Sequence, residues 1–181
     1  MDRREILRLG LAAFPVSVWA QHHPEVPGIL AQTASAKNWK PEFFNAQQNE
    51  TVIVLSELII PTTDTPGAKA ALVNRHMDHL LAASKPGQQA PISNGLAWMD
   101  AYAQKTGGKQ FVGLRPAEQV AILEKLSTPG VEGKPAEDLV EGTRFFNVFK
   151  SFTSRIYYAT EIGTEELNKG GRVPAGTGCP A

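Results

Sequence analysis

Residues 136–159, AEDLVEGTRFFNVFKSFTSRIYYA, decide the fold class of this chain. Apolar side chains recur in this stretch at spacings of three and four, which is the period of a helix buried along one side. The stretch therefore predicts a long helix over Ala136–Ala159. Its main apolar stripe consists of Phe145, Phe149, Phe152 and Ile156, broadened by Phe146, Val148, Tyr157 and Tyr158.

Four more helices are predicted upstream of this stretch, each from apolar residues spaced by three and four. Proline or glycine follows the first three of them, as expected where a helix ends. Pro116 suits the first turn of the fourth, whose apolar face is predicted to hold Val120, Leu123 and Leu126. The first three span Gln47–Ile60, Ala68–Ala83 and Ile92–Thr106.

The predicted fold is all-α, a single helical domain of about five helices with extended N- and C-terminal arms. No stretch alternates between apolar and polar residues as a half-buried strand does. The helical domain is predicted over residues 47–169, between an arm over residues 21–46 and a Gly- and Pro-rich tail over residues 170–181. Hydrophobic residues make up 42% of the 181-residue chain, which is enough to build a core and argues against general disorder.

Residues 1–20, MDRREILRLGLAAFPVSVWA, predict a twin-arginine export signal. Arg3 and Arg4 form the arginine pair, a short apolar run follows, and Ala20 ends a small-residue cleavage site. Pro15 would break a helix that belonged to the fold. The alternative is an ordinary N-terminal helix of a cytosolic protein with a chance Arg-Arg pair. The signal predicts that the protein crosses into the periplasm in a folded state.

Charge and cysteine content exclude several classes of partner and site. The net charge is zero and no cluster of Lys or Arg indicates nucleic acid. No run reaches the roughly 18 apolar residues that a stable membrane span needs. The single cysteine, Cys179, cannot form an intramolecular disulfide, and it leaves no basis for a cysteine-bound metal cluster in this chain. In an exported protein it is a candidate for a disulfide to a partner subunit.

The sequence offers little that could carry catalysis or hold a cofactor. His76 and His79 lie three residues apart on a predicted helix and could share a metal ion, although the pattern supplies no third ligand. A nucleophile elbow and a Gly-rich phosphate loop are both missing. We therefore predict no cofactor or metal in this chain. Two other interpretations stay open: a stand-alone periplasmic metal-binding protein or enzyme using His76 and His79, and a stand-alone helical binding module.

A protein partner is the interpretation that the aromatic residues favour. A single amphipathic helix cannot place every aromatic side chain of residues 145–158 on one stripe, so some are expected to need cover from another surface. A turn-rich loop, Pro61–Gly67, adds an acidic side chain, and the third predicted helix adds a tryptophan. The candidate partner-binding residues are Asp64, Trp98, Phe146, Tyr157, Tyr158 and Cys179.

Four stretches, in this order, resemble the gluconate 2-dehydrogenase subunit 3 family. They are TVIVLSELIIPTTDTPGA (51–68), NGLAWMDAYA (94–103), LRPAEQVAILEKL (114–126) and FFNVFKSFTSRIYYATEIGTEELNKGG (145–171). Each stretch is a weak motif, but four in the right order behind a twin-arginine signal make the resemblance fairly specific. It covers about residues 50–171.

The resemblance implies a non-catalytic small subunit of a periplasmic dehydrogenase complex. The large partner would be an FAD-dependent flavoprotein of the glucose–methanol–choline (GMC) type that oxidises a sugar, a glycoside or gluconate. A c-type cytochrome carrying haem c would accompany it in many members. The small subunit is expected to stabilise the flavoprotein as a chaperone, to provide the signal read by the twin-arginine translocase, and to reach the membrane surface through its complex.

Overall fold

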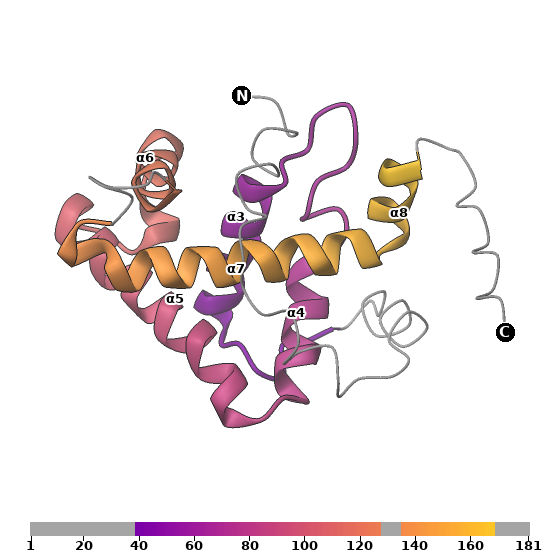
Figure 1. The fold of residues 1–181 in the computed structure, drawn as a ribbon, viewed down its shortest axis with the longest axis horizontal. Helices are drawn as coiled ribbons and strands as arrows, with labels where there is room; N and C mark the ends of the chain where they lie inside the picture. The colour runs from indigo at the N-terminus through magenta and orange to yellow at the C-terminus, as the bar shows by residue number, and fades with distance from the viewer. Residues whose placement is uncertain (1–38, 128–134, 169–181) are drawn as a thin grey trace, which may run out of the picture.

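The computed structural model describes residues 39–127 and 135–168, and these ranges form an all-α domain (Figure 1). Six α-helices and no strand are present in them, which confirms the predicted fold class. Two 3₁₀ turns, η2 (Phe111–Gly113) and η4 (Glu137–Leu139), connect helices. The helices are α3 (Ala46–Ile59), α4 (Val73–Ala82), α5 (Pro86–Gly107), α6 (Pro116–Ser127), α7 (Val140–Ala159) and α8 (Glu161–Asn168).

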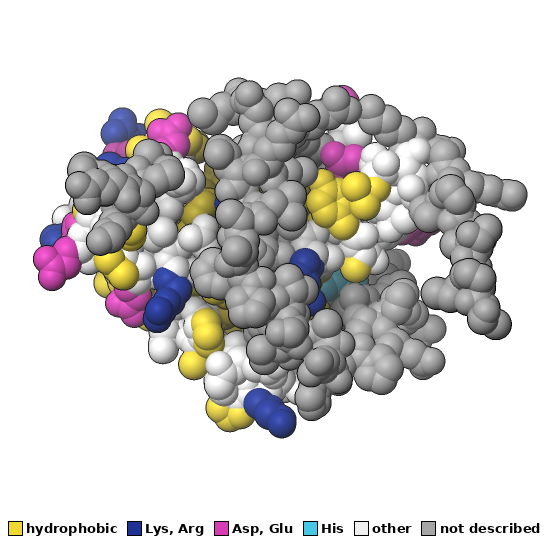
Figure 2. Space-filling view, in the orientation of Figure 1, with side chains coloured by type: hydrophobic (Ala, Val, Ile, Leu, Met, Phe, Trp, Pro, Cys, Tyr) yellow, Lys and Arg dark blue, Asp and Glu magenta, His cyan; other side chains and the backbone are white. Residues whose placement is uncertain are grey.

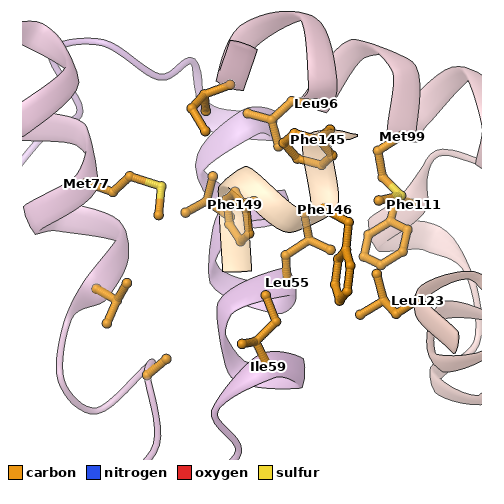
Figure 3. Close-up of a cluster of buried hydrophobic side chains, with 14 of the residues drawn as sticks. Leu55, Ile59, Met77, Leu96, Met99, Phe111, Leu123, Phe145, Phe146 and Phe149 are labelled. Atoms are coloured by element: carbon orange, nitrogen blue, oxygen red, sulfur yellow. The ribbon is translucent and has the colours of Figure 1, made fainter. Parts of the chain in front are cut away.

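The centre of the domain is α7, the helix predicted from the opening stretch. It contacts α3, α4, α5, α6 and α8, and Figure 1 shows it running across the other helices. Phe145 and Phe149 of α7 are buried, and Figure 3 shows Phe145 beside Leu96 of α5 and Phe149 on the side toward Met77 of α4. Burial of such side chains contributes roughly 1.5–3 kcal/mol each, so α7 organises most of the core.

Two glycines let α5 and α7 approach closely. A Cβ atom on Gly95 of α5 would lie 1.9 Å from Cδ2 of Phe145, and a Cβ atom on Gly142 of α7 would lie 2.1 Å from Cη2 of Trp98. Each helix therefore places an aromatic ring against a glycine of the other. Neither position has room for a larger residue unless the facing ring moves.

The second predicted helix begins later than expected. Helix α4 starts at Val73 rather than Ala68, because residues 69–72 form turns that end with Leu72 in the left-handed region at φ 53°. The backbone N–H of Val73 donates a hydrogen bond to the carbonyl oxygen of Ala68, which closes this turn. A left-handed leucine costs about 1–2 kcal/mol and breaks the helical path at that point.

The third predicted helix begins earlier than expected. Helix α5 starts at Pro86 rather than Ile92, and Pro91 lies inside it. Pro86 suits the first helical position because its missing N–H needs no partner there. Pro91 removes the bond to the carbonyl oxygen of Gly87, but both residues are exposed and water can satisfy that oxygen.

The predicted apolar face of α6 is wrong at one position. Val120 is 40% exposed, and its neighbour Gln119 is buried and donates from Nε2 to the carbonyl oxygen of Phe111 at 2.9 Å. This bond holds the connector before α6 with a buried amide. The start of α6 is fixed by Glu118, whose carboxylate accepts from the Arg115 backbone at 2.8 Å and from its guanidinium at 2.7 Å.

Helix α8 was not predicted as a separate element. Thr160 ends α7 in an extended conformation, and its hydroxyl oxygen accepts from the N–H of Gly163 at 3.2 Å, as an N-cap does. A Cβ atom on Gly163 would lie 2.0 Å from the backbone oxygen of Tyr157. Gly163 therefore lets α8 fold back against the end of α7.

Candidate functional site

A buried carboxylate holds the N-terminal end of the described region. Asp78 of α4 is 1% exposed, and its two oxygens accept from the backbone N–H groups of Glu42, Phe43 and Phe44 at 2.8, 3.1 and 2.8 Å. Bonds from N–H groups to a charged acceptor are stronger than neutral ones. Asp78 thus fixes the segment before α3 onto α4.

A second set of contacts strengthens this attachment. The Arg75 guanidinium lies over the Trp39 ring at 5.2 Å, a cation–π contact. Asn74 donates from Nδ2 to Oδ1 of Asn49 at 2.8 Å, which ties α4 to α3. Residues 39–49 are therefore part of the folded body, although they fall largely in the predicted arm.

We expect Asp78→Asn to release this segment. The asparagine amide has the same size but only one acceptor oxygen, and its NH₂ group would face backbone N–H donors. At least one buried hydrogen bond is therefore lost, which costs roughly 1–3 kcal/mol of stability. Amide exchange at residues 42–44 should rise about tenfold or more. Hydrogen-exchange mass spectrometry measures it, with the exposed Asp138→Asn as control. Unchanged protection in Asp78→Asn would show that the carboxylate is dispensable.

His76 does not show the surroundings of a metal ligand. It is 5% exposed, and its Nδ1 atom has no hydrogen-bond partner among the described residues. The nearest acid in sequence, Asp78, is already occupied by backbone N–H groups. Within residues 39–127 and 135–168, no group of three or more His, Cys, Asp or Glu residues is arranged to hold a metal ion. The geometry therefore gives no support to a metal site at His76 and His79.

The environment of His76 makes stability depend on pH. Burial lowers the pKa of His76, and the neighbouring His79 and Arg75 lower it further. In the unfolded chain, His76 binds its proton with the ordinary histidine pKa of about 6.5. Between the lowered and the ordinary pKa the unfolded state holds more protons, so the free energy of unfolding rises with pH.

We therefore expect stability to fall as the pH drops from about 6.5 through the lowered pKa of His76. His76→Gln should flatten this decline because glutamine does not titrate. Urea unfolding at several pH values between about 5 and 8 measures it. The carboxylates contribute equally to the pH dependence of the unfolding free energy in both proteins. The difference between the two slopes is therefore the contribution of His76. Equal slopes would contradict the expectation.

Two of the candidate partner-binding residues belong to the core instead. Phe146 is 6% exposed and Tyr157 is 0% exposed, so neither offers surface to another protein. In Figure 3 Phe146 lies close to Leu55 of α3. The Tyr157 hydroxyl donates to the carbonyl oxygen of Pro66 at 2.7 Å and is also hydrogen-bonded to the Glu166 carboxylate of α8. The prediction that these two rings need outside cover is wrong, because helices on several sides of α7 cover them.

Trp98 and Tyr158 are half-buried. The Trp98 ring stacks on Tyr102 at 4.9 Å between centroids, and its inner edge faces Gly142. Tyr158 meets Tyr157 edge to face at 5.2 Å. Each ring therefore keeps one part in contact with the core and another part accessible. Their role in binding a partner stays a prediction.

Asp64 lies in an exposed loop that other residues hold in place. Its Oδ1 atom accepts from the Thr63 hydroxyl at 2.7 Å. The Glu57 carboxylate accepts from the N–H groups of Thr62 and Lys69, both at 2.8 Å, and so bridges the two ends of the loop. Nothing in the sequence singles out Glu57, because a glutamate near the end of a helix resembles any solvent-facing one.

Four residues singled out from the sequence lie outside the described residues. They are Arg3, Arg4 and Ala20 of the predicted signal and Cys179 of the tail. Among the described candidates, the adjacent Tyr157 and Tyr158 contact each other. None of the helices in the described ranges is long and apolar enough to cross a membrane.

Comparison with known proteins identifies the family. Comparisons with curated proteins and with solved structures give no significant match. A family model described as gluconate 2-dehydrogenase subunit 3 matches residues 46–171, which is more than half of the chain and includes every described helix. The chain therefore belongs to the gluconate 2-dehydrogenase subunit 3 family, whose members are subunits of a multi-subunit gluconate dehydrogenase complex.

Proposed function

We propose that this chain is the non-catalytic small subunit of a periplasmic, FAD-dependent dehydrogenase complex. Its large partner is a GMC-type flavoprotein that binds FAD and oxidises a sugar, a glycoside or gluconate. The chain stabilises that flavoprotein and provides the twin-arginine signal that exports both as a folded pair. A cytochrome carrying haem c takes the electrons, and the complex brings the chain to the membrane surface.

The observation that carries the proposal is the family match over residues 46–171. The Arg3-Arg4 pair ahead of a short apolar run supports the export role. The described part of the chain adds a further argument. Two of its buried polar side chains, Asp78 and Gln119, bond to backbone groups and hold segments of the fold in place.

Expression of the flavoprotein with and without this chain tests the proposal. With the chain, we expect active flavoprotein in the periplasm. Without it, we expect the activity to stay in the cytoplasm or to be lost as the flavoprotein is degraded. A flavoprotein that reaches the periplasm active and stable by itself would overturn the proposal.

A further inference from the structure

The outward side of α7 is the part of this helix that no other described helix covers. The inward residues of α7, from Gly142 to Tyr157, are buried against five other helices. The opposite side carries Val140, Arg144, Val148, Ser151 and Arg155, all exposed and spaced by three and four. We call these five residues the outer stripe. It spans 16 residues, or about 22 Å along the helix axis.

The outer stripe combines exposed apolar side chains with cations that make no ion pair within the described residues. Val140 is 51% exposed and Val148 is 38% exposed. Neither Arg144 nor Arg155 makes an ion pair with another described residue. Lys150, beside the stripe, adds a third cation and lies over the Phe146 ring at 5.7 Å. Figure 2 shows one face of the domain, where exposed apolar side chains lie among charged ones.

The charge balance of α7 indicates what would cover the stripe. Helix α7 contains three basic residues, Arg144, Lys150 and Arg155, and one acidic residue, Glu141, so its net charge is +2. Arginine beside small apolar patches is typical of protein–protein interfaces. An acidic surface complements such a stripe and disfavours basic competitors.

The remaining segments of this chain do not supply that acidic surface. Residues 21–38 carry one acid, Glu25, and one base, Lys37. Residues 128–134 likewise carry Glu132 and Lys134, and residues 169–181 carry only Lys169 and Arg172. Residues 1–20 carry two acids and three bases. None of these segments has a net negative charge, which favours another molecule as the source of the acidic complement.

We infer that the outer stripe of α7 is the surface that docks on the flavoprotein subunit, and that the flavoprotein meets it with a patch of Asp and Glu around an apolar spot. The inference rests on the proposed function, because it takes the flavoprotein as the partner. It locates the contact on the face of α7 rather than on the buried aromatics Phe146 and Tyr157.

Charge reversal on the stripe tests the inference. We expect the double variant Arg144→Glu/Arg155→Glu to bind the purified flavoprotein subunit about 30-fold more weakly, the loss caused by truncating a hot-spot arginine. Its binding should also lose most of its salt dependence. Both side chains are exposed, so the thermal unfolding of the isolated chain should stay unchanged.

The matched control is Lys105→Glu/Lys125→Glu, which changes the net charge equally on exposed positions of α5 and α6. We expect it to bind within about threefold of the original chain. Isothermal titration calorimetry at low and high salt measures all three proteins. Equal affinity of the two double variants would overturn the inference and leave the proposed function intact.

Three other outcomes would also overturn the inference. If the unsubstituted chain does not bind the flavoprotein at all, the proposed function fails and the inference falls with it. If Arg144→Glu/Arg155→Glu abolishes self-association in light scattering but not flavoprotein binding, the stripe joins two copies of this chain. If it abolishes binding only to vesicles of phosphatidylglycerol, the stripe meets a membrane surface.

Discussion

Gly95→Ala should lower the free energy of unfolding by about 3 kcal/mol, at the upper end of the cost of overpacking a core. The added Cβ atom would lie 1.9, 2.2 and 2.7 Å from three ring atoms of Phe145. Phe145 is 3% exposed and sits where α5 meets α7, so its ring cannot move without displacing other core residues. Alanine has a higher helix propensity than glycine, by up to about 1 kcal/mol, and this gain offsets only part of the strain. Urea unfolding of the purified chain measures the difference.

The same helix provides the control. Gly87 of α5 has no atom within 4 Å of an added Cβ, so Gly87→Ala should leave stability unchanged or raise it slightly. A second variant identifies the cause. Phe145→Leu makes room for the Cβ atom, so Gly95→Ala/Phe145→Leu should lose less stability than the sum of the two single changes. If the two losses simply add, the ring is not what makes Gly95 necessary.

The aromatic stretch around Phe145 shows how far the sequence determines this fold. Its period was sufficient to predict α7 and its end at Ala159. The predicted start at Ala136 is wrong, because a 3₁₀ turn precedes α7 and the helix begins at Val140. With 20 residues, α7 is also shorter than α5, which has 22. The same stretch misled the prediction of exposed rings, because a helical wheel shows one helix and not its neighbours. Phe146 and Tyr157 point away from the main stripe, yet α3 and α8 with the loop before α4 enclose them.

The contacts that attach the N-terminal segment could not be read from the sequence. Asp78 binds backbone N–H groups 34 to 36 residues away, and such partners leave no trace in residue types or spacing. By contrast, the start of α8 did have a local signal. Thr160 is a favoured N-cap residue directly after a long helix, and its side chain caps the turn at Gly163. Local signals of this kind are readable, whereas distant pairings depend on the tertiary structure.

Replacing Arg3 and Arg4 with lysine should leave nearly all of the dehydrogenase activity in the cytoplasm. If residues 1–20 act as the export signal of the pair, the translocase must recognise this arginine pair. A guanidinium presents a planar fork of donors, whereas an ammonium keeps only the charge, so Arg→Lys is not conservative at a recognised site. The measurement is flavoprotein activity in periplasmic and cytoplasmic fractions of cells that express both chains.

The control for this experiment lies in the same stretch. Arg8→Lys changes a third arginine between the pair and the apolar run, and it should leave export intact. The paired variant should still bind the flavoprotein in a cytoplasmic extract, because the outer stripe of α7 is unaltered. That result would separate the export role of the first 20 residues from the binding role of the helical domain. If the flavoprotein is exported normally with the Arg3→Lys/Arg4→Lys variant, residues 1–20 are not its twin-arginine signal. This conclusion would hold whether or not the chain binds the flavoprotein.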